Sequence, residues 1–169
     1  DKMNFFESSE HSEKYLDKNG DSNNVLFLPA FNGLGAPYWD SDVRGGFYGI
    51  TQDSSINDMV TACFNSIAFQ TREITMILEK YDIEVSSLLV DGGMVHNNTF
   101  CEILANSLQK QILRPQNVES TAVGACIVAM MASGEDLNKI QVSEIDCFKP
   151  NADNMKRNEN HFKEWKSYL

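Results

Sequence analysis

Two adjacent glycines and an asparagine, Gly92, Gly93 and Asn97, have the types and spacing best suited to bind a ligand. The glycines follow the apolar run Leu88–Val90, and the asparagine begins a segment with helical periodicity. Backbone without Cβ atoms can approach a flat ligand closely and can adopt positive φ. The free N–H groups at the start of a helix attract phosphate and ribose oxygens. This pattern is compatible with nucleotide binding, but by itself it is a modest signal, because strand-glycine-helix turns often occur without a ligand.

The other candidate residues have simpler interpretations. Asn97 is a favourable helix N-cap whatever else it binds. We expect Arg44 and Arg72 to be solvated or salt-bridged rather than phosphate ligands. The three histidines are far apart and no cysteine pair has metal-ligand spacing, so we assign no metal ligand.

The composition describes an acidic chain of 169 residues with a formal net charge of −10. Nucleic acid and anionic membranes require a basic surface, so we expect neither as a partner. ATP is not excluded, because Mg²⁺ and helix ends neutralise its phosphates locally. Cys63, Cys101 and Cys126 lie in helix-like runs without a CxxC pattern, which predicts buried, reduced thiols and a cytoplasmic protein.

Alternating strands and helices must position the glycine turn. We expect a frayed helix and a loop over residues 1–24, strands at 25–28, 46–51, 87–91 and 112–114, and helices beginning at Ser55, Asn97 and Ser120 or Thr121. Ser55 and Asp58 have capping-box spacing, and the apolar stripe behind them predicts a core-facing helix. The helix that ends before Gly134 is apolar nearly all round, which predicts burial on two sides.

This alternation predicts an α/β fold in which helices flank a mixed sheet. Ligands of such folds bind at the carboxyl ends of strands, where Gly92 and Gly93 lie.

Several segments, in order, resemble the FGGY family of carbohydrate kinases: Phe27–Asp40, Gly46–Gln52, Ile67–Glu73, Val90–Asn98 and Glu119–Ala125. The similarity is dense from Val25 to Gly134 and is greatest to the branch that phosphorylates glycerol. It is weakened slightly by Asn32, Gly35, Cys63 and Asn65, which differ from the usual family residues. The resemblance implies a ribonuclease-H-like, actin-like ATPase fold. Residues 1–169 would form most of the C-terminal nucleotide-binding lobe, with a terminal helix at 155–169 packing on it and the N-terminal lobe outside this sequence.

The resemblance also implies an activity, in which the γ-phosphoryl group of ATP moves to glycerol with Mg²⁺ present and gives sn-glycerol 3-phosphate. Gly93 would contact the nucleotide through its backbone and Asn97 through its amide, while Gly92 allows the turn. The catalytic aspartate, glycerol pocket and phosphate loops would precede Asp1, so the chain alone would be inactive. The intact enzyme would form a homo-oligomer. The alternatives are another FGGY kinase, for xylulose or gluconate, and a non-catalytic nucleotide-binding lobe.

Overall fold

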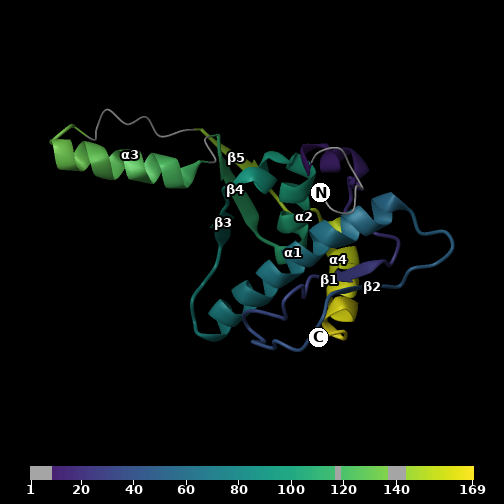
Figure 1. Cartoon of the computed structure of the whole chain (residues 1–169). Helices are drawn as coiled ribbons and strands as arrows, with labels where there is room; N and C mark the ends of the chain where they lie inside the picture. Colours follow the sequence, from purple (N-terminus) through teal and green to yellow (C-terminus); the bar gives the residue numbers. More distant parts are fainter. Residues whose placement is uncertain (1–8, 117–118, 137–143) are drawn as a thin grey trace.

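The computed structural model describes residues 9–116, 119–136 and 144–169 (Figure 1). The elements, in chain order, are η1 (Ser9–Tyr15), β1 (Leu26–Leu28), β2 (Gly46–Tyr48), α1 (Ile56–Lys80), β3 (Ser87–Leu89), η2 (Gly93–His96), α2 (Asn98–Leu108), β4 (Gln111–Pro115), α3 (Ser120–Ser133), β5 (Ile145–Phe148) and α4 (Ala152–Lys166). Strands β1 and β2 form an antiparallel pair. In a second, mixed sheet, β3 is parallel and β5 antiparallel to the central β4. This arrangement confirms the predicted α/β class with a mixed sheet.

The long helix α1 begins where its capping box predicts. The backbone N–H of Ser55 donates to Oδ2 of Asp58 at 2.7 Å, and the N–H of Asp58 donates to Oγ of Ser55 at 3.3 Å. These two bonds satisfy N–H groups that the first helical turn cannot use internally. The helix therefore starts from a local signal that needs no tertiary contact.

The buried face of α1 is wider and more polar than predicted. The stripe expected to form the core is only partly buried, and Ile74 is 45% exposed. Instead Thr61, Asn65 and Glu73 are among its buried residues. The reason is that α1 packs against β1 on one side and α2 on another, so two faces are covered.

The C-terminal helix α4 closes the core formed with β1 and α1. Its Phe162 and Trp165 are buried against Phe69 of α1 and Leu28 of β1. The indole Nε1 of Trp165 donates to the carbonyl oxygen of Phe27 at 2.8 Å. A buried indole N–H that is paired in this way avoids the cost of an unmet hydrogen bond.

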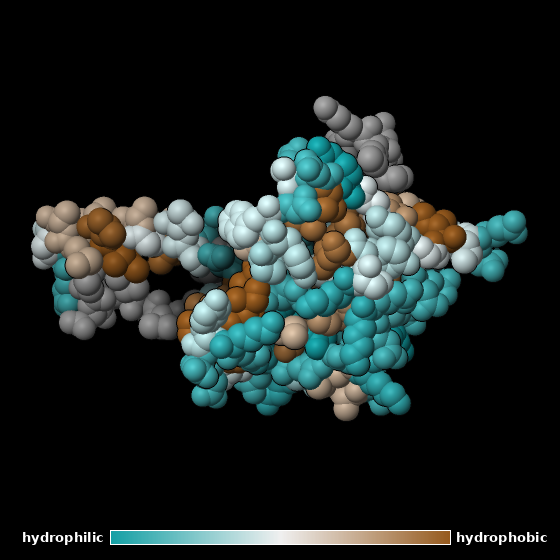
Figure 2. Space-filling model, turned by 90° about the horizontal axis from the view of Figure 1, so that it is seen from below, coloured by the Kyte–Doolittle hydropathy of each residue, from teal (hydrophilic) through white to brown (hydrophobic). Residues whose placement is uncertain are grey.

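Helix α3 contradicts the predicted burial on two sides. None of its residues is buried, and Val128 and Met131 are 66% and 60% exposed. Figure 1 shows α3 standing apart from the rest of the molecule, and Figure 2 shows hydrophobic atoms on its surface. A helix with apolar side chains on all sides is expected to pack against another surface, and none of the described residues buries α3. The predicted end is confirmed, because Gly134 takes φ +76 at the C-cap, but Glu119 rather than Ser120 holds the N-cap position.

The remaining corrections are local. Strand β5 was not expected. The helix expected within residues 1–24 is the 3-10 helix η1, and residues 1–8 lie outside the described ranges. All four cysteines are free, but only Cys101 is buried; Cys63 is half-buried and Cys126 is exposed on α3. Among the described helices, none is both long and apolar enough to cross a bilayer.

Candidate functional site

The candidate site is the turn between β3 and α2. After β3, the N–H of Val90 still donates to the carbonyl oxygen of Leu113 at 2.9 Å, so the strand leads directly into the turn. Gly92 has φ +90 and precedes η2, which leads into the N-cap of α2 at Asn97. The structure thus places Gly92 and Gly93 just beyond the carboxyl end of a parallel strand pair.

The space beside the two glycines is open. A Cβ atom built on Gly92 or on Gly93 would meet no atom within 4 Å. At Gly33 and Gly45, by contrast, a Cβ would lie 2.5 and 2.7 Å from other backbone atoms. Gly92 still needs to be glycine because of its positive φ. At Gly93 neither the backbone angle nor a neighbouring atom of the described chain requires glycine, which leaves room for a ligand against the main chain.

Asn97 caps α2 as predicted. Its Oδ1 accepts a hydrogen bond from the backbone N–H of Phe100 at 2.9 Å. Its Nδ2 has no hydrogen-bond partner within the described ranges. The side chain can therefore cap the helix with its oxygen and offer its two amide hydrogens to a ligand at the same time.

Arg114 on β4 connects the turn to the sheet by hydrogen bonds. Sequence analysis did not identify it as part of the site. Its Nη1 donates to the carbonyl oxygens of Val95 at 2.7 Å and of His96 at 3.3 Å. Its Nη2 lies 2.7 Å from Oδ2 of Asp146 on β5. One guanidinium therefore fixes two carbonyls of the turn to the sheet. The only sequence signal was its position before Pro115 at the end of a strand, which does not reveal the partner.

The thiol of Cys101 contributes to the same bracing. Its Sγ donates to the carbonyl oxygen of Val95 at 3.4 Å, and burial is the largest influence on the thiol, raising its pKa above the ordinary value. A buried thiol that stays protonated acts as a weak hydrogen-bond donor and not as a nucleophile.

The two arginines considered as phosphate ligands are engaged elsewhere. Nη2 of Arg72 forms an ion pair with Glu159 at 2.5 Å. Nη1 of Arg44 donates to the carbonyl oxygens of Ser41 and Val43. Both observations agree with the predicted structural roles. In the part of the chain that the structure describes, no three His, Cys, Asp or Glu side chains are grouped so that they could hold a metal ion.

Comparison with known sequences gives a consistent family. The sequence model named "FGGY family of carbohydrate kinases, C-terminal domain" matches residues 4–133. The chain is 38% identical to the glycerol kinase of Alkaliphilus metalliredigens and 39% identical to that of Vibrio cholerae, in each case over 98% of this chain and 34% of the relative. It is 42% identical to the glycerol kinase of Haloferax volcanii over 78% of this chain and 26% of the relative. The chain therefore spans about a third or less of the length of these curated relatives.

Comparison with solved structures gives the same fold. The crystal structure of Plasmodium falciparum glycerol kinase with ADP matches with a TM-score of 0.79 and 25% identity, over 98% of this chain and 35% of that one. The xylulose kinase of Lactobacillus acidophilus matches with a TM-score of 0.74 and 24% identity, over 94% of this chain and 33% of that one.

Proposed function

The chain belongs to the FGGY family of carbohydrate kinases, and on this basis we propose that it binds the adenosine end of ATP in a kinase that phosphorylates glycerol. The observation that carries the proposal is the open turn Gly92–Asn98, where a Cβ atom on either glycine would meet no atom within 4 Å. Curated glycerol kinases align over 98% of the chain and include this turn.

The residues of the turn fit a nucleotide. Gly93 leaves its main chain uncovered, so adenine and ribose can lie against it without a clash. Asn97 can donate from Nδ2 to the nucleotide while its Oδ1 holds the cap. Gly92 provides the backbone angle that brings the strand end and the helix start together. Arg114 keeps the carbonyls of this turn on the sheet.

ATP supplies the phosphoryl group, which passes to a terminal hydroxyl of glycerol to give sn-glycerol 3-phosphate. Phosphoryl transfer also needs an acceptor base, Mg²⁺ and phosphate-binding loops in one closed site. We assign none of these to the described residues and place them in the two thirds of the relatives' length that this chain does not span. The whole enzyme is proposed to act in the cytoplasm as a homo-oligomer, with Mg²⁺ held mainly by the nucleotide's phosphates.

Glycerol is the preferred acceptor because the identity to curated glycerol kinases reaches 38–42%. The solved xylulose and gluconate kinases of Lactobacillus acidophilus are 24% and 22% identical to this chain, and this similarity supports the shared fold only. Kinetics of the full-length protein with glycerol, xylulose and gluconate separate these acceptors. Preference for xylulose or gluconate would reject the glycerol assignment and leave the nucleotide site untouched.

The direct test is ADP binding to the 169-residue chain, measured by isothermal titration calorimetry. Gly93→Ala should weaken ADP binding at least about tenfold, equivalent to about 1.4 kcal/mol. The control is Gly35→Ala, which also places a Cβ in open space but lies outside the turn. Equal ADP affinity in the folded Gly93→Ala protein and the unsubstituted chain would remove Gly93 from the site. The chain alone, given ATP and glycerol, should show no turnover.

A further inference from the structure

The loop between β1 and β2 contains an asparagine followed directly by a glycine, Asn32–Gly33. The side chain of Asn32 is exposed and forms no hydrogen bond with a described residue. No hydrogen bond is found from the backbone N–H of Gly33 to a carbonyl of the described chain. The side-chain amide and the backbone nitrogen beside it are therefore both free to react.

An asparagine that precedes glycine can react with its own main chain. The backbone nitrogen of Gly33 attacks Cγ of Asn32, a C–N bond forms, and the C–Nδ2 bond breaks. The proton of the attacking N–H leaves with Nδ2 as ammonia, and a cyclic imide remains. Water then opens the imide at one of its two carbonyls and gives aspartate or isoaspartate. Glycine favours the attack because no Cβ shields its nitrogen, and water is the only other reactant.

A second pair of the same type, Asn19–Gly20, provides an internal comparison because the fold restrains it. The backbone N–H of Gly20 donates to the carbonyl oxygen of Asp17 at 2.9 Å. Its own carbonyl oxygen accepts from Nδ2 of Asn65 at 3.0 Å, and Gly20 is buried. The N–H of Asn19 donates to Oδ1 of Asp17 at 2.8 Å. The attacking nitrogen of this pair is therefore already engaged.

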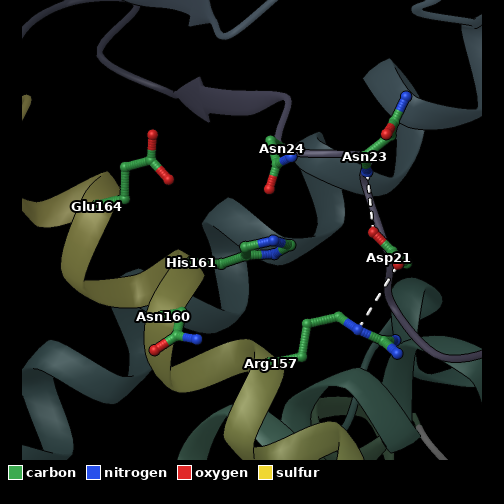
Figure 3. Close-up of a pocket in the computed structure, with 7 residues that line it drawn as sticks. All are labelled: Asp21, Asn23, Asn24, Arg157, Asn160, His161 and Glu164. Atoms are coloured by element: carbon green, nitrogen blue, oxygen red, sulfur yellow. Dashed lines mark hydrogen bonds and ion pairs between the residues drawn. The ribbon is translucent and has the colours of Figure 1, made fainter.

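The rest of that loop is also tied down. Oδ1 of Asp21 accepts from the N–H of Asn23 at 2.9 Å, and Oδ2 lies 3.6 Å from Nε of Arg157 on α4 (Figure 3). Asn19 can react only after these bonds open locally, and such opening has a free-energy cost. Asn32 has no comparable bonds to break within the described ranges.

Isoaspartate does not fit the native backbone at Asn32. Gly33 has φ +90, and a Cβ built there would lie 2.5 Å from the carbonyl oxygen of Asp40. The two stretches of main chain are therefore in close contact. The N–H of Leu34 donates to the same carbonyl at 2.6 Å. Isoaspartate inserts an additional methylene group into the main chain immediately before this contact, so it displaces both Gly33 and Leu34.

We propose that Asn32 is a site of spontaneous deamidation and isomerisation, which loosens the loop at residues 29–45 as the protein ages. The bond between Leu34 and Asp40 closes this loop internally. Tyr38 connects the loop to α1, because its Oη donates to Oε2 of the buried Glu73. Breaking the internal closure leaves that side-chain bond to hold the loop on the helix.

The test incubates the folded 169-residue chain in mildly alkaline buffer, which promotes loss of the attacking N–H proton. Peptide mapping by mass spectrometry follows replacement of each amide by a carboxyl group, and electron-transfer fragmentation distinguishes isoaspartate from aspartate. We expect Asn32 to convert at least about tenfold faster than Asn19, because only Asn19 must wait for local opening. In urea the two sites should convert at similar rates. Equal conversion in the folded chain, or faster conversion of Asn19, would overturn the proposal.

The structural consequence is tested with Asn32→Ser, which removes the amide and keeps a small polar side chain at the exposed position. After the same incubation, the unsubstituted chain should have a lower Tm and Asn32→Ser should keep its Tm. An equal fall in both proteins would reject loosening of the loop by this site. Conversion of Asn32 to aspartate without isoaspartate would reject it as well.

Discussion

Nη1 of Arg114 on β4 lies 2.7 Å from the carbonyl oxygen of Val95 in η2, and this bond joins the sheet to the turn that precedes α2. Val95 itself is buried, so the turn is held both by a charged hydrogen bond and by apolar packing. Hydrogen bonds from charged donors contribute more than neutral ones. The arrangement means that the position of Gly93 and Asn97 depends on a residue that would not itself contact a nucleotide.

Arg114→Lys should destabilise the chain by about 1–3 kcal/mol, because an ammonium cannot reach Asp146 and the two turn carbonyls in the same geometry. Urea unfolding measures the change. Arg44→Lys is the control, since within the described part of the chain Arg44 bonds to nearby carbonyls of its own exposed loop. If the two substitutions cost the same, Arg114 has no special role in bracing the turn.

Gly92→Ala should cost about 1–2 kcal/mol of stability, because an L side chain is strained at the φ of +90 found there. Gly93→Ala should change stability little, since its Cβ would meet no atom within 4 Å. Thermal unfolding of both variants gives the comparison. Equal losses of stability in the two variants would show that the backbone of the turn differs from the geometry described.

Asn97→Asp should separate the capping role from the proposed ligand contact. Aspartate caps helices as well as asparagine does, so stability should stay within about 0.5 kcal/mol, whereas the lost Nδ2 donors should weaken ADP binding. Asn151→Asp is the matched control, because Asn151 caps α4 through the N–H groups of Asp153 and Asn154. If folded Asn97→Asp binds ADP with unchanged affinity, Asn97 caps the helix and does not contact the nucleotide.

His161 should make the chain less stable in mild acid. Burial lowers its folded-state pKa below the ordinary value near 6.5, against the opposing influence of Asp21 and Glu164, while Arg157 acts in the same direction as burial. Below pH about 6.5 the unfolded chain takes up a proton that the folded chain resists. Stability is therefore fully present above that pH and falls as the pH drops toward the folded pKa.

Urea unfolding across pH 5 to pH 8, a range of about three units around the ordinary histidine pKa, measures this slope. His161→Gln should flatten it, and His96→Gln, at an exposed position in η2, should not. A slope that persists in His161→Gln would assign the acid sensitivity to other groups.

Local signals predicted the parts of the fold that local bonds determine. The capping box of α1, the cap at Asn97 and the glycine stop at Gly134 each depend on residues within four positions of one another. Such features form from backbone groups that any isolated segment would need to satisfy. The pairing of β3 with β4 follows the alternation of strands and helices.

Features that depend on distant residues were not predictable in the same way. The bond of Arg114 to Val95 spans 19 positions, and the ion pair of Asp21 with Arg157 joins residues from opposite ends of the chain. The buried polar face of α1 also has no periodic signal, because it arises only when a second neighbour covers it. For α3, the pattern described the chemistry of the helix correctly but could not say where its partner would be.

Helix α3 carries apolar side chains around its whole circumference, and this geometry limits what could shield it from water. A flat protein surface packs against one side of a helix only, so the apolar side chains on the opposite side would remain exposed to solvent. A groove that contacts two sides of α3 is needed to bury them. An assembly that shields all sides of α3 from water must therefore contact the helix from two opposite sides.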